Sequence, residues 1–212
     1  MAVKMAEIVC ILDRSGSMSG LVEETIAGFN GFLKEQRDAG PGKMTLVLFD
    51  DRYEIVYEDE PLSQAPDLNT DTYYTRGSTA LLDAVGETIA RVKERQMGKP
   101  PIDTLFLIIT DGEENASIEY VGEGKVKAMV NDCINDLGWT FLYLGANVNA
   151  FHEAGKMGIP MAMAANYDPT KSGTHRMYGA ASTATSLTRS GETLDSGGNT
   201  LSDLYDDAEN DK

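Results

Sequence analysis

The 212-residue sequence predicts an α/β fold, a doubly wound and mostly parallel sheet with helices on both of its faces. Strand-like and helix-like segments alternate along the chain, which is typical of a parallel sheet whose connections are helices. The segment 104–110 is almost continuously apolar, as expected for a central strand buried on both faces. Hydrophobic residues make up 42% of the chain, so it contains enough apolar side chains for a sizeable core.

The expected strands are short apolar or alternating runs bounded by turn residues. They cover residues 7–12, 44–49, 53–57, 104–110, 139–144 and 160–164. After the second strand, Asp50-Asp51-Arg52 turns the chain directly into the alternating segment 53–57, which indicates a hairpin. We therefore expect one edge strand of the sheet to run antiparallel to its neighbour.

The expected helices show apolar residues at helical spacing. They cover residues 20–37, 80–95, 124–137, 150–157 and 170–188. The first ends at Ala39-Gly40-Pro41-Gly42, and the last is rich in Ser, Thr and Gly. The polar connection 61–77 contains two prolines, and a connection of this length in a compact domain is usually functional or loosely ordered.

Residues 1–190 are expected to form one domain and residues 191–212 an acidic, disordered tail. The tail contains seven Asp or Glu and one Lys, with few large apolar residues to offset the entropy of ordering. The net charge of -16 disfavours nucleic acid and anionic membranes as partners, because like charges repel. Cys10 and Cys133 are expected to be buried thiols, and no apolar run approaches the about 18 residues of a membrane span. We expect a cytoplasmic, monomeric protein.

Polar side chains follow two expected strands at the points where these strands end. Asp13-Arg14-Ser15-Gly16-Ser17-Met18 places a carboxylate and two hydroxyls at alternate positions after the first strand, so that all three can turn toward one point. Thr79 lies where a loop enters a helix, and Asp111 directly follows the apolar strand 104–110. Ligands bind at the carboxyl ends of strands in open α/β sheets, and hard oxygen ligands suit a cation such as Mg2+.

This set of five residues resembles the metal-ion-dependent adhesion site (MIDAS) of von Willebrand factor A domains, a family that includes the integrin inserted domains. The resemblance covers nearly the whole chain. Intracellular single-domain members from bacteria and phages are similar in that they consist of a sheet, a metal site and little else. It implies that Ser15 and Ser17 coordinate a metal through their hydroxyls. It also implies that Thr79 and Asp111 alternate between direct and water-mediated contact, and that Asp13 acts through water and by orienting the serines.

The donor chemistry agrees with a binding function. Two carboxylates and three neutral hydroxyls do not surround Mg2+, Mn2+ or Ca2+ completely, so the metal keeps open positions and stays electrophilic. An Asp or Glu of a partner protein would complete the site. The sequence therefore predicts a metal-dependent protein-binding adaptor or scaffold rather than an enzyme.

Residues around this site are candidates for partner contacts: Arg14, Tyr73, Tyr74, Arg76 and Glu113. Adjacent exposed tyrosines anchor interfaces well, and the two arginines would pair with further acidic groups of a partner. Each of these candidate contact residues also has an alternative role. The arginines can be solvated surface charges, one tyrosine can pack inward, and Glu113 can stabilise the start of a helix.

The alternative is a Mg2+-dependent phosphatase-like hydrolase with Asp13 as its nucleophile. Enzymes of that kind resemble one another in a second Asp two residues after the nucleophile, and this chain has Ser15 there. His152 and His175 show no zinc-site spacing, and no Gly-rich phosphate loop is present. The sequence favours binding over hydrolysis.

Overall fold

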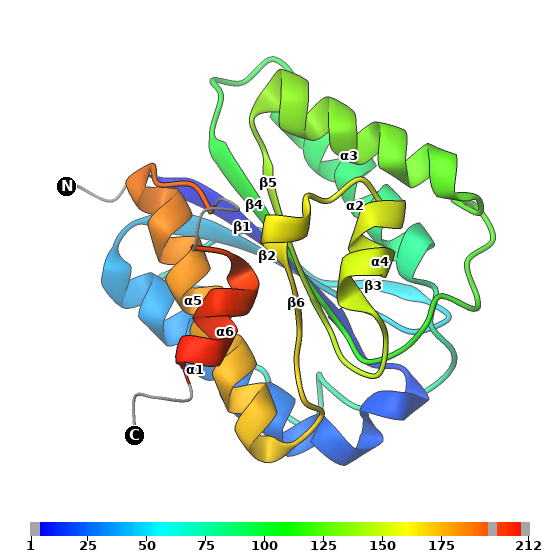
Figure 1. Ribbon diagram of the computed structural model, residues 1–212. Coiled ribbons are helices and arrows are strands. Elements are labelled where there is room, and N and C mark those ends of the chain that lie inside the picture. The colour runs from blue at the N-terminus through cyan, green and yellow to red at the C-terminus, as the bar shows by residue number, and fades with distance from the viewer. Residues whose placement is uncertain (1–4, 195–198, 209–212) are drawn as a thin grey trace.

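The computed structural model describes residues 5–194 and 199–208, and it contains a six-stranded sheet with helices on both faces (Figure 1). The strand order is β3-β2-β1-β4-β5-β6, and every pair is parallel except β2 with β3. The strands are β1 Ala6–Asp13, β2 Gly42–Phe49, β3 Tyr53–Pro61, β4 Asp103–Thr110, β5 Thr140–Gly145 and β6 Ala164–Asn166. The predicted fold class and its antiparallel edge strand are both confirmed.

Each face of the sheet is covered by its own set of helices (Figure 1). The helices are α1 Val22–Ala39, α2 Leu81–Gln96, α3 Glu123–Leu137, α4 Ala150–Lys156, α5 Lys171–Ser190 and α6 Leu201–Asp207, with two 3-10 turns, η1 Gly16–Leu21 and η2 Met161–Met163. Helices α1, α5 and α6 pack on one face, and α2, α3 and α4 pack on the other. Among the described residues, no helix is both long and apolar enough to cross a membrane.

The core consists of two layers, one on each side of the sheet, because successive strand residues point to opposite faces. In β1, Ile8 and Cys10 pack against the layer under α1 and α5, and Val9 and Ile11 pack against the layer under α2. Every residue of β1 is buried, which explains the continuous apolar run 8–12 within it. Both cysteines are buried free thiols, as expected.

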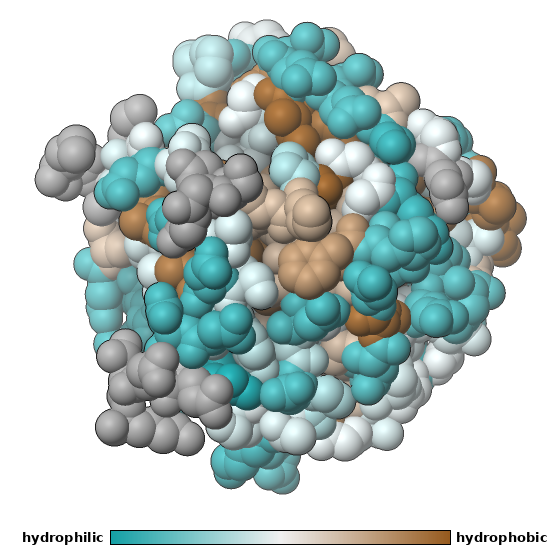
Figure 2. Space-filling view, in the orientation of Figure 1, coloured by the Kyte–Doolittle hydropathy of each residue, from teal (hydrophilic) through white to brown (hydrophobic). Residues whose placement is uncertain are grey.

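The last strand differs from the expected segment 160–164. After Pro160 the chain forms η2, and only residues 164–166 pair with β5, beginning with Ala164 opposite Tyr143. Proline supplies no backbone donor for a ladder and is accommodated at the start of a turn, so the pairing begins later than the apolar pattern indicates. Figure 2 shows a small apolar area in the middle of this face, where Figure 1 places η2 and β6, within a largely hydrophilic surface.

The expectation of a disordered tail is wrong for the described part of residues 191–212. Helix α6 begins with a capping box, in which Thr200 and Asp203 satisfy each other's backbone donors. Leu201 and Tyr205 are buried against the layer that contains α5, and the Tyr205 hydroxyl accepts a hydrogen bond from the Asp168 backbone. Residues 195–198 and 209–212 of the expected tail lie outside the described residues.

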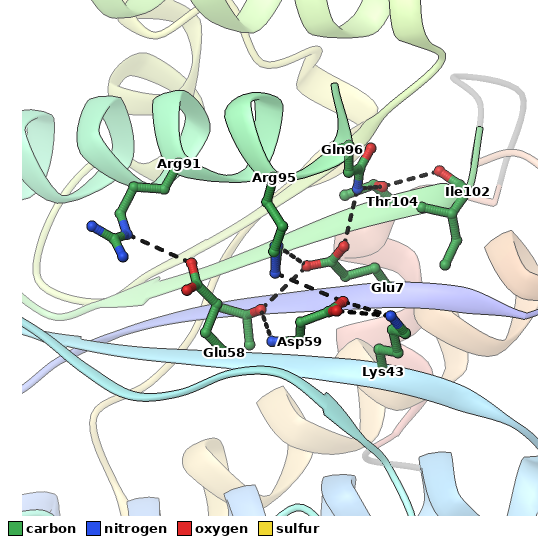
Figure 3. Close-up of polar contacts among 10 residues, drawn as sticks. Glu7, Lys43, Glu58, Asp59, Arg91, Arg95, Gln96, Ile102 and Thr104 are labelled. Atoms are coloured by element: carbon green, nitrogen blue, oxygen red, sulfur yellow. Dashed lines mark hydrogen bonds and ion pairs between the residues drawn. The ribbon is translucent and has the colours of Figure 1, made fainter. Parts of the chain in front are cut away.

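A network of charged side chains joins α2 to the sheet at its amino end, opposite the carboxyl ends of the parallel strands (Figure 3). Glu7 of β1 is almost fully buried and accepts hydrogen bonds from Arg95 and Gln96 in the last turn of α2. Burial raises the pKa of Glu7, and the nearby Arg95 guanidinium opposes that rise. A second ion pair, Lys43 with Asp59, continues the network to β2 and β3. These contacts fix α2, whose first turn lies beside Thr79.

The packing of α6 can be measured with Leu201→Ala. Leu201 is fully buried, so we expect the substitution to lower the free energy of unfolding by about 2–4 kcal/mol through the lost apolar contacts and the cavity that remains. Urea denaturation followed by circular dichroism gives this value. The neighbouring Ser202→Ala serves as the control, with an expected change within about 0.5 kcal/mol. Equal stabilities of both variants and the wild type would mean that α6 does not pack as described.

Candidate metal site

The two central strands of the sheet bring the predicted ligands together. β1 ends at Asp13 and β4 ends at Thr110, and these parallel neighbours are paired up to Leu12 opposite Ile109. Asp13 and Asp111 therefore leave the sheet side by side at its carboxyl edge. The chain after β1 then turns into η1, which carries Ser17 back toward Asp111.

Short contacts join four of the five predicted residues, Asp13, Ser15, Ser17 and Asp111. The Ser15 and Ser17 hydroxyl oxygens lie 3.0 Å apart, and the Ser17 hydroxyl donates to Oδ1 of Asp111 at 2.5 Å. Thr79 is placed by Gly112: a Cβ on Gly112 would lie 3.1 Å from Thr79 Oγ1 and 3.4 Å from Ser17 Oγ. A side chain at position 112 would crowd both hydroxyls, so the glycine leaves room beside them.

Both oxygens of the Asp13 carboxylate accept hydrogen bonds. Oδ1 accepts from the Ser15 backbone N–H at 2.6 Å, and Oδ2 accepts from the Thr110 hydroxyl at 2.6 Å. Thr110 is a site residue that the sequence reasoning missed. Its signal was present, since it is a polar residue that ends an apolar strand directly before Asp111.

The electrostatics of the site favour a bound cation. Asp13 is 0% exposed and Asp111 is 3% exposed, and within the described ranges neither forms an ion pair with a basic side chain. Burial raises the pKa of Asp13 to about 6, opposed by its hydrogen bonds from Thr110 and Ser15, and burial also raises the pKa of Asp111. Buried carboxylates are normally paired or coordinate a metal, so these two lack the compensation that a divalent cation would supply.

The residues present fit a hard cation held mainly by hydroxyls. In the described part of the chain, no three His, Cys, Asp or Glu side chains gather closely enough to hold a metal by themselves. A metal at this site must therefore use Ser15, Ser17 and Thr79 together with the two carboxylates. Oxygen-only donor sets of this kind suit Mg2+, Mn2+ and Ca2+.

Backbone hydrogen bonds fix the loops that carry the ligands. The Thr79 N–H donates to the side chain of Asn115 at 2.9 Å, and the Asn115 N–H returns a bond to the Thr79 carbonyl at 3.0 Å. The Gly16 N–H donates to the carbonyl of Gly77, which joins η1 to the same loop. Gly77 has a φ of +65°, a left-handed conformation that favours glycine, and a Cβ there would also displace the side chain of Asp51.

Two of the predicted partner contacts are wrong. Tyr73 is fully buried, and its hydroxyl donates to the Asp13 carbonyl at 2.7 Å, so this side chain supports the end of β1 from the protein interior. Arg14 is also fully buried, because its guanidinium pairs with Asp50 and Glu54. A buried, paired guanidinium and a buried ring do not reach a partner.

The other three residues of the predicted rim are at the surface. Tyr74 is 44% exposed, and the guanidiniums of Arg14 and Arg76 each lie 5.4 Å from the centroid of its ring. Arg76 is partly exposed and pairs with Asp50. Glu113 is exposed. Their contact with a partner stays a prediction.

Two cavities lie at different distances from the site. The larger, about 930 Å³, lies between α1 and α5 near the end of α6, and none of the five predicted ligands lines it. The smaller, about 490 Å³, is lined by Glu113, two residues after Asp111, and by the loops that follow β5 and β6. The smaller cavity therefore belongs to the same edge of the sheet as the candidate site.

Comparisons with known proteins place the fold. No family model matches the sequence, and no curated protein matches it. Among solved structures, the chain is similar to "von Willebrand factor type A from Catenulispora acidiphila", with a TM-score of 0.58 and 13% identity over 86% of this chain and 43% of that chain. It is also similar to the pilus adhesin SpaC from Lactobacillus rhamnosus GG, with a TM-score of 0.66 and 13% identity over 89% of this chain and 31% of that chain.

A third similar structure is described as holding a metal. It is proximal thread matrix protein 1 from the mussel byssus "with zinc occupied MIDAS motif", with a TM-score of 0.61 and 13% identity over 89% of this chain and 46% of that chain. This chain spans less than half the length of each of these three proteins. At such identities the similarity shows the fold alone. The chain therefore has the fold of von Willebrand factor A domains.

The role of Thr110 can be tested with Thr110→Val, which keeps the shape of the side chain and removes the hydroxyl that orients Asp13. Loss of a group that positions a ligand typically lowers metal affinity by about 10- to 100-fold. We expect a loss of this size, measured by isothermal titration calorimetry with Mn2+ and Mg2+. Thr185→Val is the matched control, because Thr185 is equally buried and its hydroxyl donates to the Ala181 carbonyl within α5, away from the site. Unchanged affinity in Thr110→Val would exclude this role.

Proposed function

We propose that this protein is a metal-dependent protein-binding module, which captures an acidic residue of a partner through Mg2+ held by Asp13, Ser15, Ser17, Thr79 and Asp111. The observation that carries the proposal is the pair of buried carboxylates, Asp13 and Asp111, that lacks a basic partner in the described part of the chain and adjoins three hydroxyls. The similar structure with a zinc-occupied MIDAS supports a divalent cation in this fold.

The donor set explains why binding should be the outcome. Neutral hydroxyls donate less charge than carboxylates, so a cation on this site would remain attractive to an incoming carboxylate. Asp13 orients the Ser15 backbone and receives the Thr110 hydroxyl, so its part is to hold the loop after β1 in position. Asp111 accepts from Ser17 and ties that loop to the end of β4.

Hydrolysis is less well supported than binding. A nucleophilic aspartate needs an oxygen that is free to attack, but both oxygens of Asp13 accept hydrogen bonds and the residue is fully buried. Ser15 stands where a second carboxylate would serve as acid and base. We therefore propose a protein that binds without turnover, acting as a monomeric adaptor in the cytoplasm.

The proposal predicts that peptide capture depends on both the metal and the site. We expect a phage-displayed library of random 12-residue peptides, selected on the immobilised protein in Mg2+, to yield binders that share an Asp or Glu. EDTA should release them, and changing the shared Asp or Glu to its amide should abolish binding. Asp13→Ala should lose at least about tenfold in affinity for Mg2+ and for the selected peptides, because it removes a charged group that orders the ligands.

The control for this experiment is Asp71→Ala, which removes an exposed carboxylate from the loop before Thr79. We expect it to bind metal and peptides like the wild type. Circular dichroism should show that Asp13→Ala keeps its fold. Peptide capture that persists in EDTA and in Asp13→Ala would overturn the proposed metal bridge.

The same preparation tests the hydrolase alternative. We expect no Mg2+-dependent turnover of p-nitrophenyl phosphate above the rate with EDTA, because Asp13 is buried and hydrogen-bonded at both oxygens. The assay compares the wild type with Asp13→Asn. Turnover that requires Mg2+ and vanishes in Asp13→Asn would establish an enzyme instead.

A further inference from the structure

A cavity of about 490 Å³ opens beside the candidate metal site, at the carboxyl ends of β5 and β6. Glu113 lines it from the loop after β4, Asn147 and Phe151 from the loop and helix after β5, and Asn166 and Tyr167 from the end of β6. We call this the Glu113 cavity. It is a shallow hollow that is widely open to solvent, so a side chain of a bound partner has access to it.

The Glu113 cavity and the metal site share structural supports. The Ala146 N–H, next to the cavity-lining Gly145, donates to the Thr110 carbonyl at 3.0 Å, and the Tyr167 N–H donates to the Gly145 carbonyl at 3.0 Å. Tyr167 is buried, and its pKa is raised first by burial and further by the carboxylates of Asp111 and Asp13. The Glu113 cavity and the candidate ligands therefore lie at the same edge of the sheet, joined through the backbone after β4, β5 and β6.

The charge of the cavity comes from one carboxylate. Among the described residues that line it, Glu113 alone is charged, and Glu113 makes no ion pair or side-chain hydrogen bond in the described part of the chain. The amide oxygens of Asn149 and Asn166 already accept backbone hydrogen bonds, from His152 and Ala150. Glu113 is thus the one charged acceptor among the described residues at this opening.

These features match a guanidinium group better than other side chains. Arginine offers five donors in a planar fork, which a carboxylate accepts in pairs, and its flat face stacks on aromatic rings. The cavity supplies the carboxylate of Glu113 and the ring of Phe151. The net charge of -16 also favours approach of a basic partner.

We propose that the Glu113 cavity binds an arginine side chain of the same partner whose Asp or Glu reaches the metal. The partner is thus a protein segment that carries an acidic and a basic residue at a fixed spacing. That this segment is also the metal-bound partner rests on the proposed function. The affinity of the Glu113 cavity for a guanidinium is independent of that function.

The first experiment uses peptides that contain one fixed Asp with every other position randomised, selected in Mg2+. We expect the wild type to enrich Arg at one position relative to the Asp. Glu113→Gln should lose that enrichment and bind the selected peptides about tenfold more weakly, because a charge-assisted hydrogen bond is lost. Glu113→Arg should instead enrich Asp or Glu at the same position.

The matched control is Glu119→Gln, the same chemical change at an exposed carboxylate on the same loop that does not line the cavity. It should select the same peptides as the wild type. Enrichment of Lys in place of Arg, or of no basic residue at all, would overturn the arginine proposal while leaving the metal-bridge function intact.

A second experiment is independent of the metal. Nα-acetylarginine amide is titrated into ¹⁵N-labelled protein in EDTA, and Nα-acetylcitrulline amide, which is uncharged and nearly isosteric, is titrated in parallel. We expect the arginine compound to shift amide signals of Glu113, Asn147 and Asn166, with these shifts reduced in Glu113→Gln and absent with the citrulline compound. Equal shifts with both compounds, or none, would overturn the proposal even if no metal-dependent peptide is ever selected.

Discussion

The carboxylate of Asp13 joins the two central strands at the point where they leave the sheet, and the geometry of the site depends on this junction. One oxygen accepts from the Ser15 backbone and the other from the Thr110 hydroxyl. The Tyr73 hydroxyl donates to the Asp13 backbone carbonyl, and this bond ties the loop that leads to Thr79 to the end of β1. A single buried residue thus sets the relative positions of the strand ends and of the loop between β3 and α2.

The strand order and the two-sided core follow from residues that the sequence displays directly. The alternation in β3 and the continuous apolar runs of β1 and β4 predict an edge strand and central strands respectively. The candidate ligands could be predicted because strand ends in such sheets share one edge. Thr110 also lies at a strand end on this edge. The sequence analysis does not identify it as a site residue because it continues the apolar strand.

Other features depend on contacts between distant residues, which local patterns do not contain. Arg14 is buried because Asp50 and Glu54 come close to it only in the folded sheet. The two adjacent tyrosines of the long loop differ in burial for the same reason, because the path of the folded loop turns Tyr73 alone inward. The sequence analysis did not predict helix α6 for another reason. The high density of acidic residues indicates a disordered segment, although the sequence contains the capping box at Thr200 and the helical apolar spacing of residues 201, 204 and 205.

Helix α6 also bears on how the sheet ends. β6 pairs with only three residues of β5, and an uncovered edge strand offers unpaired backbone groups to other chains. α6 packs beside β6 and η2, so this helix shields that edge. The opposite edge has a different protection, because β3 carries Glu58, Asp59 and Glu60 and its pairing with β2 is interrupted by register shifts. Resistance to strand-to-strand aggregation is therefore built into both borders of the sheet, by a helix on one side and by charge and irregular pairing on the other.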